Sequence, residues 1–115
     1  MSRRHNARGK GNSKGSALLF AALGDKTRLR LVSRLCDGGP KSITRLTEGS
    51  RVTRQAISKH LRVLEGAGLV RGKRRGRETL WQLEQRRLQE ARHYLDLISL
   101  QWDKALLRLR ELVEE

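Results

Sequence analysis

The 115-residue chain contains one cysteine, one proline and few aromatic residues, and it has no long apolar run. A single cysteine excludes a disulfide within the chain, and this one has no Cys or His partner at metal-ligand spacing. Because no stretch of about 18 apolar residues is present, the sequence predicts no transmembrane helix. The basic N-terminus lacks the apolar segment of a secretory signal, so we expect a cytoplasmic protein without a membrane partner.

The cysteine, Cys36, lies between Leu35 and Asp37 in an apolar-periodic segment. We expect it to behave as a small buried residue, as free cysteines commonly do. A redox-sensitive contact between two subunits is the alternative interpretation.

Acidic residues are scarce: 26 lysines and arginines face 12 aspartates and glutamates, which gives a net charge of +14. Residues 1–83 carry +15, whereas the last 32 residues carry −1. Nucleic acid is the leading partner for such a surface, since Lys and Arg release condensed counterions from phosphates. Ribosomal, membrane-surface and simply solvated proteins share this charge, so it does not decide the function alone.

Catalytic groups are also few. Three histidines, one cysteine and scattered acids offer no nucleophile with a base and no paired carboxylates. We therefore expect neither an enzyme nor a cofactor.

The chain divides into a disordered basic arm over residues 1–15 and one domain over residues 16–115. The arm has nothing apolar to bury. A short apolar helix follows over residues 16–24, with Ser16 as a possible cap. Asp25 then suits the N-cap of a second helix that ends near Cys36 and buries Leu29, Val32 and Leu35.

Two further helices are predicted after the break at Gly38-Gly39-Pro40. Ser42 can cap a short helix through Glu48, and Thr53 can cap a longer one that ends near Gly66. Residues 69–73 and 78–83 are typical of two strands joined by a basic turn, and a helix of roughly 30 residues begins near Glu84. The predicted fold is mainly α with a small β-hairpin: a winged helix-turn-helix with a long C-terminal dimerisation helix.

The helix that follows Thr53 is polar on its outer face. At 100° per residue, Ile57, His60 and Leu61 fall on a core arc, and the opposite arc carries guanidinium, amide, hydroxyl and ammonium groups. Such groups can read base edges in a DNA major groove. We expect His60 to pack with one ring nitrogen satisfied. The predicted base-reading residues are Arg54, Gln55, Ser58 and Lys59.

The hairpin that follows carries a basic tip at residues 74–77. In a winged helix such a tip lies against the DNA backbone or enters the adjacent minor groove. With the polar helix it forms the predicted DNA surface. The predicted backbone-contacting residues are Thr53, Arg62, Lys73, Arg74, Arg75 and Arg77.

The last helix repeats apolar residues from Leu88 to Leu112 at alternating spacings of three and four, which is typical of a helix that packs against another helix. A second copy of the chain is the expected partner, and packing on the first helix is the alternative. A two-fold dimer would place two reading helices about 34 Å apart. The predicted dimer residues are Leu18, Leu19, Ala22, Leu95, Ile98, Trp102, Ala105 and Leu109.

Three segments together resemble the ArsR family of bacterial winged-helix regulators: "LGDKTRLRLVSRL", "TRQAISKHLRVLEGAGLV" and "RGRETLWQL". The resemblance covers about residues 16–115, and Asp25-Lys26-Thr27-Arg28 differs from the family's usual Asp-Pro-Thr-Arg by one lysine. It implies a homodimer that represses transcription at an imperfect palindrome, often in its own promoter.

Metal-sensing members of that family carry a Cys-X-Cys pair where this chain has Ser42 and Thr44, and hydroxyls bind soft metals poorly. His93 and Asp96 alone make a poor zinc site. We therefore expect no metal, and an effector that is unknown or absent. A sequence-tolerant nucleoid protein is the main alternative function, and a protein-interaction adaptor is the third.

Overall fold

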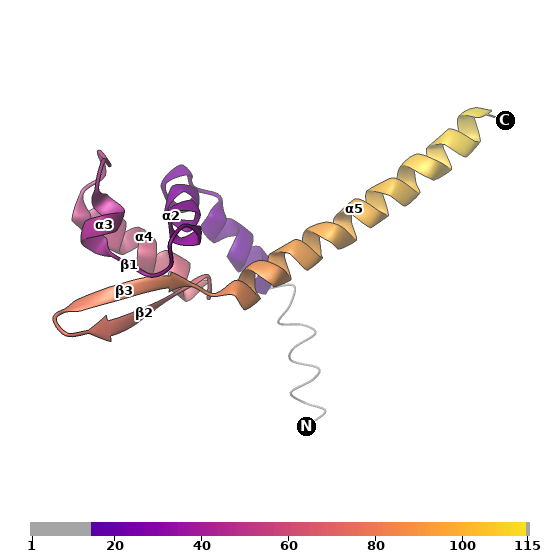
Figure 1. Cartoon of the computed structure of the whole chain (residues 1–115). Coiled ribbons are helices and arrows are strands. Elements are labelled where there is room, and N and C mark those ends of the chain that lie inside the picture. The colour runs from indigo at the N-terminus through magenta and orange to yellow at the C-terminus, as the bar shows by residue number, and fades with distance from the viewer. Residues whose placement is uncertain (1–14, 115) are drawn as a thin grey trace, which may run out of the picture.

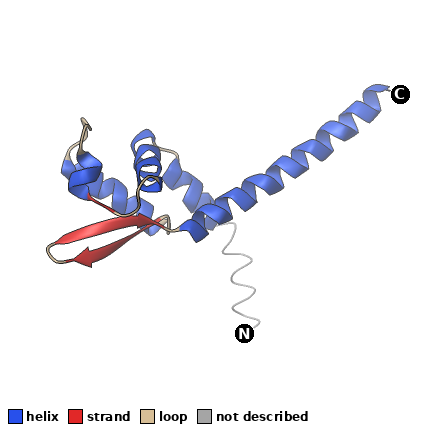
Figure 2. Cartoon of the chain, viewed as in Figure 1, coloured by secondary structure: helices blue, strands red, loops and turns tan. Residues whose placement is uncertain are grey.

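The computed structural model describes residues 15–114, and the predicted arm, apart from Gly15, lies outside them. Short helices lie over a small antiparallel sheet, and one long helix projects away from them (Figures 1 and 2). The elements are a helix over residues 15–23, α2 (Lys26–Cys36), β1 (Lys41–Ser42), α3 (Ile43–Thr47), α4 (Arg54–Gly66), β2 (Val70–Arg75), β3 (Glu78–Leu83) and α5 (Gln85–Glu114).

Three helices begin at the predicted caps. The side chains of Asp25, Ser42 and Thr53 accept hydrogen bonds from backbone N–H groups three residues ahead, at 3.0, 3.3 and 3.1 Å. Each side chain satisfies one of the amides that a helix start leaves without a partner. The prediction that Ser16 caps the first helix is wrong, because Gly15 before it is already helical.

The core lies between α2, α4 and the helix over residues 15–23, and it is aliphatic. The prediction for α2 is wrong in one position: Leu31 is buried and Leu29 is 51% exposed. Val32 and Leu35 form an arc of about 120° with Leu29 and one of about 100° with Leu31, so the sequence offers two nearly equivalent faces. The fully buried large side chains are Leu19, Leu31, Leu46, Ile57, Leu61, Leu64 and Leu69.

Cys36 is exposed, which corrects the expectation that it is buried. It is the last residue of α2 and lies about 140° around the helix from Leu31. The core face of α2 therefore ends with Leu35.

The sheet has the strand order β1-β3-β2, and all its pairs are antiparallel. The hairpin of β2 and β3 was predicted. Gly76 lies in its turn and has a φ of +64°. β2 runs two residues further than expected, to Arg75. The two-residue strand β1 was not predicted, and it pairs Lys41 with Trp81 and Ser42 with Leu80.

α5 is 30 residues long and starts and ends close to where the sequence predicts. Of its residues Ala91 alone is buried, and Leu88 packs against the core from a half-buried position. Tyr94 still reaches Phe20, with ring centroids 5.7 Å apart, and the C-terminal part of the helix extends away from the other elements (Figure 1). No helix among the described residues has the length and apolar character needed to cross a membrane.

Candidate nucleic-acid interface

α4 separates an apolar inner face from a polar outer face. Ile57, Leu61 and Leu64 point into the core, as the 3.6-residue period requires. The outer side chains line one shallow hollow on the helix surface. The residues that line it are Gln55, Ser58, Lys59 and Arg62.

The first turn of α4 lies against α3. Arg54 Nη2 donates to Thr44 Oγ1 at 3.2 Å, and both residues are exposed. Thr53, which caps α4, is exposed as well. The predicted residues at this end of α4 therefore point to solvent and leave donors free for a ligand.

An arginine from α2 holds the turn that precedes α4. Arg34 Nη1 donates to the carbonyl oxygens of Leu46 and Glu48 at 3.0 Å each, and Nη2 donates to that of Arg45 at 2.8 Å. These carbonyls lie at the end of α3, where the last C=O groups of a helix need partners, and that of Arg45 also accepts from the backbone N–H of Glu48. The contacts of Arg34 could not be predicted from the sequence, because the acceptors are backbone carbonyls 11 to 14 positions away in the chain.

The hairpin of β2 and β3 presents the basic wing, defined here as Lys73, Arg74, Arg75 and Arg77. All four side chains are exposed. Three of them also line a hollow with Pro40 beside the sheet. Arg71, at the other end of β2, forms an ion pair with Glu84, with 3.2 Å between Nε and Oε1. Its charge is therefore partly neutralised within the chain.

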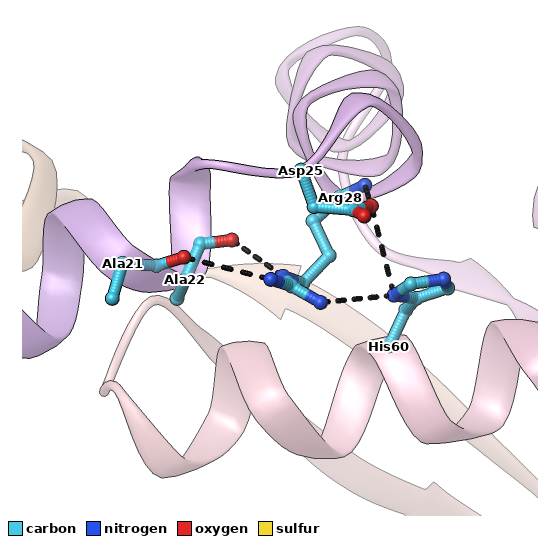
Figure 3. A network of polar contacts seen from close by, with 5 residues as sticks. All are labelled: Ala21, Ala22, Asp25, Arg28 and His60. Carbon is cyan, nitrogen blue, oxygen red and sulfur yellow. Dashed lines mark hydrogen bonds and ion pairs between the residues drawn. The ribbon is translucent and has the colours of Figure 1, made fainter.

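A polar network joins α4 to α2 and to the helix over residues 15–23 (Figure 3). Arg28 Nη1 lies 3.2 Å from His60 Nδ1, and Asp25 Oδ2 lies 3.8 Å from the same nitrogen. His60 is half-buried with that ring nitrogen engaged, as the sequence predicts. The backbone N–H of Arg28 holds the pKa of Asp25 below its ordinary value of 3.8, and the charges of Arg28 and His60 act in the same direction.

The predicted dimer residues divide into two groups. Leu18, Leu95, Ile98, Trp102 and Leu109 are between 45% and 63% exposed, and Ala105 is half-buried. Leu19 and Ala22, however, are 1% and 3% exposed and pack in the core of their own protomer, which leaves them almost no surface to offer a partner. Leu18 is then the remaining candidate on the first described helix.

The residues that replace the metal-binding cysteines have other contacts. Ser42 caps α3, and the Thr44 hydroxyl accepts from Arg54. Among residues 15–114, no three His, Cys, Asp or Glu side chains are grouped closely enough to hold a metal ion.

Comparison with known proteins gives the same architecture. A family model described as a helix-turn-helix domain matches residues 23–73. The HTH-type transcriptional regulator Rv2034 of Mycobacterium tuberculosis is 36% identical over 95 residues, which cover 83% of this chain and 85% of that protein. An ArsR-like transcriptional regulator from Rhodococcus sp. RHA1 is 32% identical, with a TM-score of 0.76 over 89% of this chain and 95% of that one.

A third protein supports the fold alone. It is the homodimeric winged helix-turn-helix DNA-binding domain of Mb0332 from Mycobacterium bovis, a possible ArsR-family regulator. It is 19% identical, with a TM-score of 0.63 over 86% of this chain and 88% of that one. The predicted winged helix-turn-helix fold is thereby confirmed.

Proposed function

This chain belongs to the ArsR family of winged helix-turn-helix transcriptional regulators, and we propose that it is a homodimeric repressor of its own promoter. Members of the family are DNA-binding regulators and not enzymes. The proposed operator is an imperfect palindrome, and the proposed place of action is the cytoplasm, where the bacterial nucleoid lies. The observation that supports the proposal is the exposed polar outer face of α4, in a chain that also exposes the basic wing.

The outer face of α4 supplies base readout. Arg54 and Lys59 can donate to guanine O6 and N7, Gln55 can bond adenine at N6 and N7, and Ser58 can bond either. Three of these side chains are exposed, and Ser58 is half-buried in the hollow that Gln55 and Lys59 also line. α4 would lie in the major groove with its N-terminal end toward the bases, as recognition helices do.

The basic wing supplies affinity for the sugar-phosphate backbone of DNA. Its four cations, together with Arg62 and Thr53, are exposed and would contact phosphates, which carry no base information. Each phosphate that such a contact neutralises makes binding more salt-dependent. A protein that used the wing alone would bind all sequences similarly, so readout by α4 separates a repressor from a nucleoid protein.

The projecting part of α5 supplies the dimer contact. It exposes large apolar side chains along much of its length, and Trp102 is 63% exposed. An apolar surface of this extent marks an interface, and a two-fold axis lets the same stripe meet itself. The homodimeric assembly of Mb0332 is consistent with this arrangement. The near-neutral charge of residues 84–115 removes the repulsion that two basic helices would experience.

Binding to the protein's own upstream DNA tests the proposal. Fluorescence anisotropy would compare that duplex with a shuffled one at about 50 and 200 mM salt. We expect a preference of roughly 10³-fold or more that survives the higher salt. Equal binding to both duplexes that collapses with salt would contradict autorepression and favour the nucleoid alternative.

A further inference from the structure

Two arginines attach the helix over residues 15–23 to α4. The first is Arg28, at the start of α2. Its Nε donates to Ala22 O at 2.6 Å and its Nη2 reaches Ala21 O at 3.5 Å, which are carbonyls at the C-terminal end of that helix. Its Nη1 lies 3.2 Å from His60 Nδ1, in the middle of α4 (Figure 3).

The second arginine, Arg87, joins the same helix to the C-terminal end of α4. Its Nη2 donates to Gly15 O at 2.6 Å, and its Nε donates to Ala67 O at 2.8 Å. Ala67 is the C-cap of α4, whereas Arg87 itself belongs to the first turn of α5. Nη1 completes the set with an ion pair to Glu90, one turn along α5.

The chain is shaped to admit this second guanidinium. Gly68 has a φ of +77°, and a Cβ built there would stand 3.2 Å from Arg87 Nε. The Arg87 side chain is only 19% exposed, so its hydrogen bonds are shielded from water. Each guanidinium contacts three groups, and a lysine could not match this planar set of donors.

We propose that Arg28 and Arg87 together fix the angle between α4 and the helices proposed to form the dimer, and so select the spacing of the operator half-sites. Both are positioning residues, and neither needs to touch DNA. The inference rests on the proposed function, because it requires a dimer that reads two half-sites.

The length of α4 makes this angle important. Its 13 residues span about 20 Å. A tilt of about 10° at its C-terminal end would move the reading residues at its N-terminal end by about 3.5 Å, close to the 3.4 Å rise of one base pair. A loosened α4 would therefore accept half-sites that the tethered helix rejects.

The test uses full-length Arg28→Met, Arg87→Met and the double variant. Arg30→Met and Arg86→Met are matched controls, because each removes an exposed arginine on the same helix as its counterpart. Arg87→Lys keeps the charge and provides a milder change if the methionine variants fold poorly. Thermal melts would first establish a temperature at which every variant compared is folded.

The readout is the ratio of affinities for three duplexes. One carries the footprinted half-sites at their natural spacing, and two carry them two base pairs closer or further apart. We expect the wild type and both controls to lose at least tenfold in affinity at altered spacing, and the double variant to lose less than about threefold. A variant that is merely less stable loses affinity for all three duplexes equally.

Two results would overturn the inference, and they are distinguishable. If the wild type prefers its natural spacing and the double variant keeps the full ratio, the arginines do not set the spacing. If Arg87→Lys is the only variant that folds, and it keeps the full ratio of affinities between natural and altered spacing, the inference is overturned as well. If the wild type binds all spacings and a shuffled duplex alike, the proposed function itself is wrong and this inference fails with it.

Discussion

Arg54 in the first turn of α4 donates a 3.2 Å hydrogen bond to the hydroxyl of Thr44 on α3. This contact joins the two helices of the helix-turn-helix on their exposed side. It restrains one end of the guanidinium and leaves its remaining N–H groups free. We therefore expect Arg54 to meet DNA as a partly ordered donor.

Replacing Arg54 or Gln55 by alanine should abolish operator preference. Each change should cost roughly 1–3 kcal/mol in binding to the operator and little in binding to random DNA, since base contacts carry the discrimination. Anisotropy titrations on both duplexes measure this. Arg108→Ala on α5 removes the same charge far along the chain and should preserve the preference. Equal losses on both duplexes for Arg54→Ala would remove it from the base-reading set.

Replacing Arg75 by alanine should weaken binding to every duplex by a similar factor. The proposed role of the wing is to contact the phosphate backbone, so the loss of one cation should flatten the plot of log affinity against log salt by about one unit. The slope is read from titrations at four or more salt concentrations. A variant that loses operator binding alone would place Arg75 among the base contacts instead.

Replacing Trp102 by alanine should give monomers. Because this side chain is 63% exposed in the protomer, its removal should leave the protomer fold intact while it weakens contact with a second copy. Sedimentation velocity measures the association, and circular dichroism checks the fold. Leu29→Ala removes a comparably exposed residue from α2 and should leave the association unchanged. An intact Trp102→Ala dimer would exclude this residue as the anchor.

Replacing Gly72 by alanine should destabilise the wing by about 1–3 kcal/mol, as overpacking does. An added Cβ would stand 3.0 Å from Thr79 Cγ2 and 3.1 Å from Trp81 Cζ3 on the facing strand. Urea unfolding followed by tryptophan fluorescence gives the free energy. Gly66→Ala is the contrasting variant, because a Cβ there meets nothing within 4 Å, and it should be neutral or stabilising by up to about 1 kcal/mol.

Asp25 should make stability depend on acid pH. Its pKa in the folded chain is lowered from 3.8, so folding favours the ionised carboxylate. The stabilisation is fully present above the unfolded pKa and is lost as pH falls through the folded one. Wild type and Asp25→Ala should therefore differ more in unfolding free energy at about pH 6 than near pH 2.5. Asp25→Asn keeps a capping side chain without its titration and should flatten the dependence; an equal gap at both pH values would contradict this role.

Periodicity and caps were enough to predict most of the fold. The 3.6-residue pattern located α4 and α5, and short polar residues before apolar runs located three helix starts. The pattern failed where two faces were nearly equivalent, as with Leu29 and Leu31 on α2. It also failed for β1, which is two residues long and exists only because β3 pairs with it.

The candidate site was only partly accessible from the sequence. Residues on the outer face of α4 follow from its period, because exposure is a local property of an amphipathic helix. The contacts of Arg28, Arg34 and Arg87 do not, since their acceptors are mostly backbone carbonyls up to 72 positions away. Backbone acceptors carry no residue signature, so an arginine that binds them resembles any surface arginine in the sequence.

Hydroxyl-radical footprinting of the protein's own promoter would separate sequence-specific reading of DNA from uniform coating. A dimer that reads DNA through α4 should protect two related half-sites whose centres lie about one helical turn, roughly 34 Å, apart. Arg54→Ala should lose this pattern at a protein concentration at which the wild type retains it. Uniform protection along the fragment, identical for wild type and variant, would contradict sequence-specific reading and leave a basic protein that coats DNA.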